Sequence, residues 1–449
     1  MRLKLYHFRH HHKKIDNSEQ FFNLLSTLNR ICLFFGVSPT LDAPESDRHI
    51  QRCLHCLWCG IWIVIIHVVN YYSITRIHNP LVDIVKIFFI IELIYNPFIV
   101  LLIVYTIYCD ADKYRKIPQE LLRIYKEYKS FQPIILSDKD LFNVLHKELY
   151  SMLGLICMII LFSLIVDFLR TDNGFIPYLI HSSVFSLPNI LISLNLGQYW
   201  LSLRFIYHLK YGFNELLSAR LKRLQWTMND DHFKRKETTD DDFNFAHTNE
   251  FSWYQREFNS SRSLAVSEYE FLESIRVPYF DLDLVRSQVT LTFGRTLFIN
   301  IIGSVVSLSV EFFAVYKYYE DDDYLGDELS QIYHRFLWIA IHIGRIILIL
   351  VTNDLIIEEI CRTSLILNQI YIRSKEMERA INQFLLRIMT QKQTEMVCGI
   401  MELDSLLITG LISAIGNYII FMIQIDLGNA TMADLAKTNI THYKWIIIK

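Results

Sequence analysis

The stretch LDSLLITGLISAIGNYIIFMIQI, residues 403–425, decides the fold class of this chain. It carries one charged side chain, Asp404, close to its start. A helix needs about 20 predominantly apolar residues to cross about 30 Å of hydrocarbon. The stretch is long enough and apolar enough, so it predicts a helix that crosses a membrane.

Six further stretches of the 449-residue chain resemble it in length and composition, and hydrophobic residues make up 52% of the whole. We therefore predict an all-α polytopic membrane protein with seven transmembrane helices. The crossings are expected at Leu54–Ile74, Leu81–Tyr108, Leu149–Phe168, Tyr178–Ile206, Thr290–Tyr316, Ile332–Val351 and Leu403–Ile425.

The distribution of Lys and Arg predicts the orientation, because cytoplasmic loops carry an excess of these residues. If the N-terminus is inside, the inside segments hold 33 Lys and Arg residues and the outside segments hold 6. We expect a cytoplasmic N-terminus and an extracellular C-terminus. This orientation is opposite to that of a G-protein-coupled receptor, so no G-protein partner is expected.

Composition divides the chain into five parts. Amphipathic patterns in the loops and at 377–400 predict helices that pack into a cytoplasmic helical base. The parts are a cytoplasmic N-terminal segment 1–53, a six-helix bundle 54–351 with a cytoplasmic loop 207–289, a cytoplasmic amphipathic region 352–402, the last helix 403–425 and an extracellular tail 426–449. In the tail, Asn439 is the expected glycosylation acceptor.

The motifs give no support for an enzyme. No P-loop, HExxH, GxSxG or dinucleotide fingerprint is present. The cluster Cys53, Cys56 and Cys59 lies at or inside the first crossing, where membrane packing explains it better than a zinc site with four ligands. We expect no cofactor, no metal and no nucleic-acid partner.

Polar residues form a stripe along the last helix. At 100° per residue, they fall within one arc about 120° wide. The stripe consists of Ser405, Thr409, Ser413, Asn417 and Gln424, with Gly416 and Ile420 on the same arc. Two interpretations remain open, namely helix–helix packing through small and polar residues, or a water-facing surface. A pore lined by one helix per chain would require an oligomer.

The segment NYIIFMIQ, residues 417–424, resembles the signature that closes the last helix of insect gustatory receptors: Thr-Tyr, five apolar residues and Gln. Tyr418 and Gln424 match in identity and spacing, while Asn417 replaces the usual Thr and Ile425 replaces the usual Phe. The FFGVSP start, the seven crossings and the long second inside loop agree with the same family.

This resemblance implies a ligand-gated, non-selective cation channel in the plasma membrane of chemosensory neurons, opened by a small tastant. Its last helices would line the pore of a homo- or heterotetramer. The implied pore and gate residues are Gln424, Ile425, Asn417, Ser413 and Ile420. Tyr418, on the opposite side of the wheel, is assigned to packing. Sugar-sensing members tend to carry Glu after the Tyr, and Ile419 stands here, which favours a bitter-type or divergent receptor.

The resemblance also implies a ligand pocket that opens to the outside among the second to sixth crossings. Polar and aromatic residues in the outer halves of these helices are the candidates, and each has an alternative role in packing or charge pairing. They are Asp167, His181, Glu311, Trp338 and His342. Further charges inside the crossings, Arg295 and Arg345 among them, are expected to pair between helices.

Two alternatives remain open. An olfactory-type receptor subunit would need a partner co-receptor. A polytopic transporter would need discontinuous helices in two matching halves, for which Asn96-Pro97 and Pro188-Asn189 are isolated candidates. The acidic residues Asp321, Asp322 and Asp323 belong to a solvated loop or to a vestibule that concentrates cations.

Overall fold

The structure is a computed structural model, and helices account for nearly all of its regular elements. It describes residues 28, 30–35, 57–65, 67–68, 83–131, 138–170, 175–238, 250–320, 329–369, 375–391 and 394–447. Cys53, Cys56 and the acidic residues 321–323 lie outside these ranges.

The helices agree well with the predicted crossings. Each of the second to seventh crossings falls largely within one helix, and residues 57–65 of the first crossing are helical. The labelled helices are α3 (Asp83–Cys109), α4 (Ala111–Phe131), α5 (Asp138–Arg170), α6 (Phe175–Thr238), α7 (Glu250–Glu320), α8 (Leu329–Asn368), α9 (Lys375–Thr390) and α10 (Leu406–Ile447).

Within the described residues, four helical segments are long and apolar enough to cross a membrane. The count rises to five if Ile94–Cys109 and Ala111–Phe131, which are bent by 72°, form one span. The chain is thus a multi-pass α-helical membrane protein, and the count of seven crossings stays a prediction. The four segments are Asn143–Phe162, Tyr269–Tyr319, Arg335–Asn368 and Leu406–Gly428.

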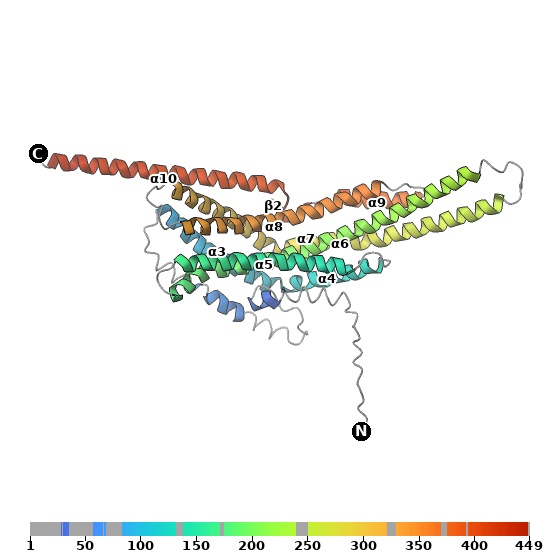
Figure 1. Cartoon of the computed structure of the whole chain (residues 1–449), viewed down its shortest axis with the longest axis horizontal. Coiled ribbons are helices and arrows are strands. Elements are labelled where there is room, and N and C mark those ends of the chain that lie inside the picture. Colours follow the sequence, from blue (N-terminus) through green and yellow to red (C-terminus); the bar gives the residue numbers. More distant parts are fainter. Residues whose placement is uncertain are drawn as a thin grey trace, which may run out of the picture.

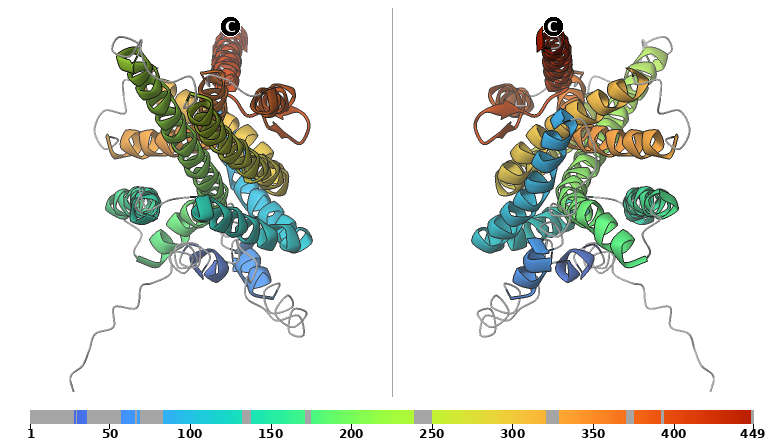
Figure 2. Two further views of the ribbon diagram at one scale, coloured as in Figure 1. Left: turned by 90° about the vertical axis from the view of Figure 1, so that its right-hand side faces the viewer. Right: turned by 90° about the vertical axis from the view of Figure 1, so that its left-hand side faces the viewer.

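Helices α6 and α7 are much longer than a crossing. They contain 64 and 71 residues, which correspond to about 96 and 106 Å at 1.5 Å per residue. Figure 1 shows them running side by side away from the rest of the bundle, and Figure 2 shows the bundle along its long axis. This protruding part fits the predicted helical extension of the second inside loop.

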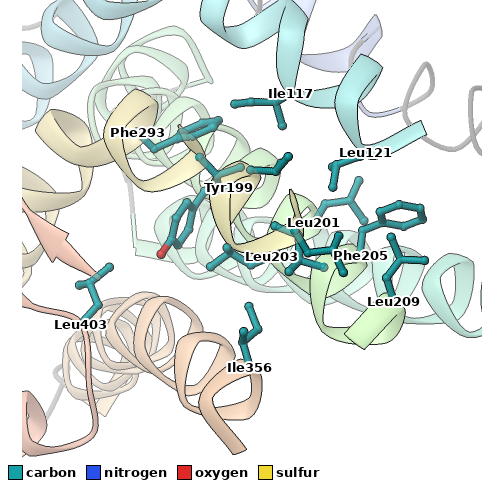
Figure 3. Close-up of a cluster of buried hydrophobic side chains, with 14 of the residues drawn as sticks. Ile117, Leu121, Tyr199, Leu201, Leu203, Phe205, Leu209, Phe293, Ile356 and Leu403 are labelled. Atoms are coloured by element: carbon teal, nitrogen blue, oxygen red, sulfur yellow. The ribbon is translucent and has the colours of Figure 1, made fainter. Parts of the chain in front are cut away.

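The core lies where α6, α7 and α8 meet, with α4 covering one side. Tyr199 of α6 lies at its centre, with ring centroids 5.8 Å from Phe293 of α7. Figure 3 shows Leu403, which precedes α10, and Ile356 of α8 beside this cluster. Because all four side chains are almost inaccessible to solvent, the segment that leads into the last helix is part of the main core.

Polar pairs are buried in the predicted cytoplasmic base. Lys210 of α6 is fully buried, and its Nζ lies 2.8 Å from an Asp283 carboxylate oxygen and 3.8 Å from the Tyr279 ring centroid. Burial lowers the pKa of Lys210, and the Asp283 charge opposes that change. Tyr279 also packs on Phe384 of α9, with ring centroids 5.4 Å apart. Helix α9 is therefore docked on α7.

The helix predicted over 377–400 is wrong in its second half. Helix α9 ends at Thr390, and the strands β1 (Met396–Val397) and β2 (Met401–Glu402) form a short antiparallel hairpin. Cys398 and Gly399 in its turn have φ angles of 54° and 69°. Such angles are incompatible with a right-handed helix, so the apolar pattern continued past the point where the backbone turns.

Candidate functional site

The polar stripe of α10 lies on the side of the helix that its own chain leaves uncovered. Its members Ser405, Thr409, Ser413, Asn417 and Gln424 are all exposed. On the opposite side, Leu411 and Ile415 pack against the main core. Packing within one chain therefore does not explain the stripe.

Two residues of the gustatory-receptor signature are exposed on α10 as well. Tyr418 is 54% exposed although it was assigned to packing, and Ile425 is 38% exposed. Neither residue is buried by the described part of its own chain. Among the described residues, the structure therefore shows no packing that covers the Tyr418 ring.

The N-terminal end of α10 is fixed by the hairpin and α8. The backbone N–H of Leu403 donates to the Glu395 carbonyl over 2.9 Å, which closes the hairpin. The N–H of Ser405 donates to the Asp354 carboxylate of α8 over 3.2 Å. Asp404 then accepts a hydrogen bond of 3.1 Å from the N–H of Leu407, as an N-cap does. The start of the helix is therefore held in a defined position.

A second contact holds the other end of the predicted crossing. Met422 packs on Phe313 of α7 in a small cluster that is separate from the main core, with Tyr316 beside it. Next to this cluster, Lys317 of α7 forms an ion pair with Asp426 of α10. We call these five residues the outer contact.

Helix α10 does not end at the predicted boundary after Ile425. It continues without a break to Ile447 and contains 42 residues, which correspond to about 63 Å. Figure 1 shows it extending past the ends of the neighbouring helices. The tail 426–449 is thus largely a continuation of the last helix.

Trp338 and His342 are neighbours on α8, as their spacing of four residues predicts. Their ring centroids lie 6.4 Å apart, and the two residues are 5% and 2% exposed. His342 Nδ1 lies 3.5 Å from the Ser304 hydroxyl of α7. A ligand that contacts this pair must move part of the packing between α7 and α8.

One turn further along α8, Arg345 connects to α6. Its Nη2 donates to the Asn189 carbonyl over 2.9 Å, to the Asn189 side-chain oxygen over 2.7 Å and to Ser193 over 3.2 Å. These contacts provide the interhelical pairing that was expected for Arg345.

Close packing continues between α3 and α7. The Tyr95 hydroxyl donates to the Ile299 carbonyl. A Cβ atom at Gly303 would lie 1.8 Å from the Tyr95 ring, so the glycine makes this close approach possible.

Glu311 is paired with a base, as one interpretation of the sequence proposed. Arg335 Nη1 of α8 lies 3.1 Å from both Glu311 carboxylate oxygens. Glu311 itself is almost fully buried. The pair neutralises a carboxylate that would otherwise be costly in a membrane.

The structure does not place every predicted site residue. Asp167 lies on α5, His181 on α6 and Asn439 on α10, and their side chains are outside the described part. Among the described residues, no group of three or more His, Cys, Asp or Glu side chains could hold a metal.

Sequence reasoning missed the partners Asn189, Ser193 and Ser304. Single polar residues in apolar helices carry a weak signal, because most of them serve local packing. For these partners, the sequence signals that indicate close helix contacts are Pro188 before Asn189 and the pair Gly303-Ser304.

Residues 25–429 match the 7tm chemosensory receptor family. The chain belongs to this family. Because the match spans nearly the whole chain, it covers the bundle, the hairpin and the crossing part of α10. This chemosensory receptor is therefore not an enzyme, and the predicted family is confirmed.

Relatives in Drosophila melanogaster support the gustatory branch of the resemblance. This receptor is 26% identical over 435 residues to a protein described as gustatory receptor 59e, which covers 96% of this chain and 100% of that protein. It is 25% identical over 190 residues to one described as gustatory receptor 59f, covering 42% of this chain and 46% of that protein.

The fold has a solved counterpart in the insect olfactory receptor OR5 from Machilis hrabei. The comparison has a TM-score of 0.54 at 10% identity and covers 91% of this receptor and 100% of that chain. At this identity the likeness establishes the shared fold alone.

Proposed function

We propose that this chemosensory receptor is a ligand-gated, non-selective cation channel in the plasma membrane of chemosensory neurons. A small tastant, of a bitter or otherwise divergent class rather than a sugar, opens it. Four subunits assemble as a homo- or heterotetramer around an axis lined by their α10 helices. The N-terminus is cytoplasmic and the C-terminus extracellular.

The single observation that carries this proposal is the exposed polar stripe. An amide such as Asn417 or Gln424 at membrane depth costs a few kcal/mol unless it meets a partner or water. The described part of the chain leaves both residues exposed, whereas Leu411 and Ile415 on the opposite side pack against the main core. Four such stripes that converge on an axis would face water and ions.

Within this pore, Gln424 stands at the narrowest part, and Ile425 supplies an apolar seal in the closed state. Asn417, Ser413 and Ile420 continue the lining towards the cytoplasm. The bundle 54–351 senses the ligand, and Trp338 and His342 form the centre of the pocket. Movement at the pocket reaches the pore through α7, because α7 packs on both α8 and α10.

Two alternatives make different predictions. An olfactory-type subunit would pass current only together with a partner co-receptor. A transporter would need discontinuous helices in two matching halves. Helices α3 and α6 continue through Pro97 and Pro188, and the described residues contain one bent helix pair, Ile94–Cys109 with Ala111–Phe131. Currents from cells that express this chain alone, recorded over a panel of sugars and bitter compounds, separate a channel formed by this chain from both alternatives. Co-expression with a co-receptor then separates the olfactory-type subunit from the transporter.

Cysteine scanning of residues 413–425 tests the pore. A charged thiol reagent applied from outside is expected to block current most strongly at position 424, and again at position 417 if it passes the gate. Met422→Cys is the matched control, because Met422 is buried against Phe313. Block that follows positions 418 and 422 instead would assign the stripe to packing.

A further inference from the structure

The ion pair between Lys317 and Asp426 joins α7 to α10 next to the proposed gate. Asp426 comes one residue after Ile425 and two after Gln424. It is 7% exposed, so the carboxylate is largely removed from solvent by its own chain. A carboxylate in this position needs a cation, and Lys317 provides it.

The apolar part of the outer contact lies within four residues of this pair along both helices. Phe313 and Met422 are almost completely buried, and the Phe313 and Tyr316 rings are stacked with centroids 6.1 Å apart. This cluster is not continuous with the main core. The outer contact is therefore a local attachment, distinct from the hairpin that fixes the N-terminal end of α10.

Helix α7 connects the outer contact to the candidate ligand region. Arg335 of α8 donates a hydrogen bond to the Glu311 carboxylate of α7. Lys317 lies six residues further along α7, which is unbroken over this stretch. Over six residues an α-helix rises about 9 Å, and the two side chains point in directions about 120° apart. One short segment of α7 thus holds α8 with one face and α10 with another.

Rigid elements that share discrete contacts carry coupling between two sites. We propose that the Lys317–Asp426 pair is the positioning contact through which movement of α7 and α8 sets the position of Gln424 and Ile425. The inference rests on the proposed channel function. Lys317 and Asp426 lie outside the gustatory-receptor signature. The inference gives them a role in gating although neither contacts the permeating ion.

The test compares Lys317→Gln, Asp426→Asn and the charge-swapped variant Lys317→Asp with Asp426→Lys. Agonist dose–response currents, surface biotinylation and melting temperatures in detergent are measured for each. The matched control is Lys113→Gln, which breaks the pair between the exposed Lys113 of α4 and Asp110 three residues before it.

Each single variant is expected to shift the half-activating agonist concentration about tenfold, which corresponds to about 1.4 kcal/mol. The swapped variant is expected to return to within about threefold of the wild type, because the attraction is restored. The control is expected to behave like the wild type at equal surface level.

Unchanged single variants, or a swapped variant no better than the singles, would overturn the proposal. Loss of surface protein in both singles with recovery in the swap would assign the pair to folding and also overturn the gating role. A wild type that gives no agonist-gated current, either alone or together with a co-receptor, would refute the channel function itself. The melting temperatures would then still report whether the two charges interact.

Discussion

The carboxylate of Asp354 on α8 accepts a hydrogen bond of 3.2 Å from the backbone N–H of Ser405, 51 residues further along the chain. The first N–H groups of a helix have no partner within the helix. Asp354 therefore helps to hold the entry of α10 from a neighbouring helix, close to where the hairpin ends.

Removal of this carboxylate should weaken the attachment of the N-terminal end of α10. We expect Asp354→Ala to destabilise the protein by about 1 kcal/mol, the usual value of such a capping bond. A lower melting temperature in detergent measures this. Asp112→Ala on α4 serves as the control, because Asp112 is largely exposed. Equal melting temperatures for both variants would contradict a capping role.

Trp338 should matter for the response to the ligand. We expect Trp338→Phe to raise the half-activating concentration of an agonist about tenfold, since a smaller ring loses contact area with the ligand. The control is Phe336→Leu on the same helix, because Phe336 is 48% exposed. Equal shifts in both variants would point to a general effect on α8 and not to a pocket.

The loss of one charge of the buried Lys210–Asp283 pair should destabilise the protein more than the loss of both. Lys210→Met leaves Asp283 without its partner in a dry site, so we expect a loss of about 3–5 kcal/mol. The double variant Lys210→Met with Asp283→Leu should recover most of this loss. Detergent melting curves of the two variants and the wild type give the comparison. A double variant that is less stable than the single one would contradict the cost assigned to the unpaired Asp283 carboxylate.

The predicted orientation can be tested at the C-terminus. An epitope tag after Lys449 should be stained on unpermeabilised cells. Asn439 should carry a glycan, which Asn439→Gln removes with a visible shift on a gel. Asn259, predicted to be cytoplasmic, provides the control and should stay unmodified. Staining that appears only after permeabilisation would reverse the assignment of all loops.

Local patterns in the sequence determined the fold class and the family of this receptor. The apolar stretches predicted helices because a crossing needs a fixed length, and Tyr418 and Gln424 carried the resemblance. The polar stripe of α10 also followed from the sequence, since a helical period of 3.6 residues fixes which side chains share a face. The sequence did not predict that the stripe is exposed, because the neighbouring helices determine which face of α10 is covered.

Only the tertiary structure decided which distant residues meet. Arg345 and Asn189 are 156 residues apart, and Lys317 and Asp426 lie on different helices. The end of α9 at Thr390 could not be predicted from the sequence either, because the apolar pattern continues through the turn at Cys398 and Gly399. Periodicity describes one helix at a time, whereas a buried charge is satisfied by whichever helix packs beside it. The packing of α7 against α8 and α10 therefore determined the contacts on which the proposed gating depends.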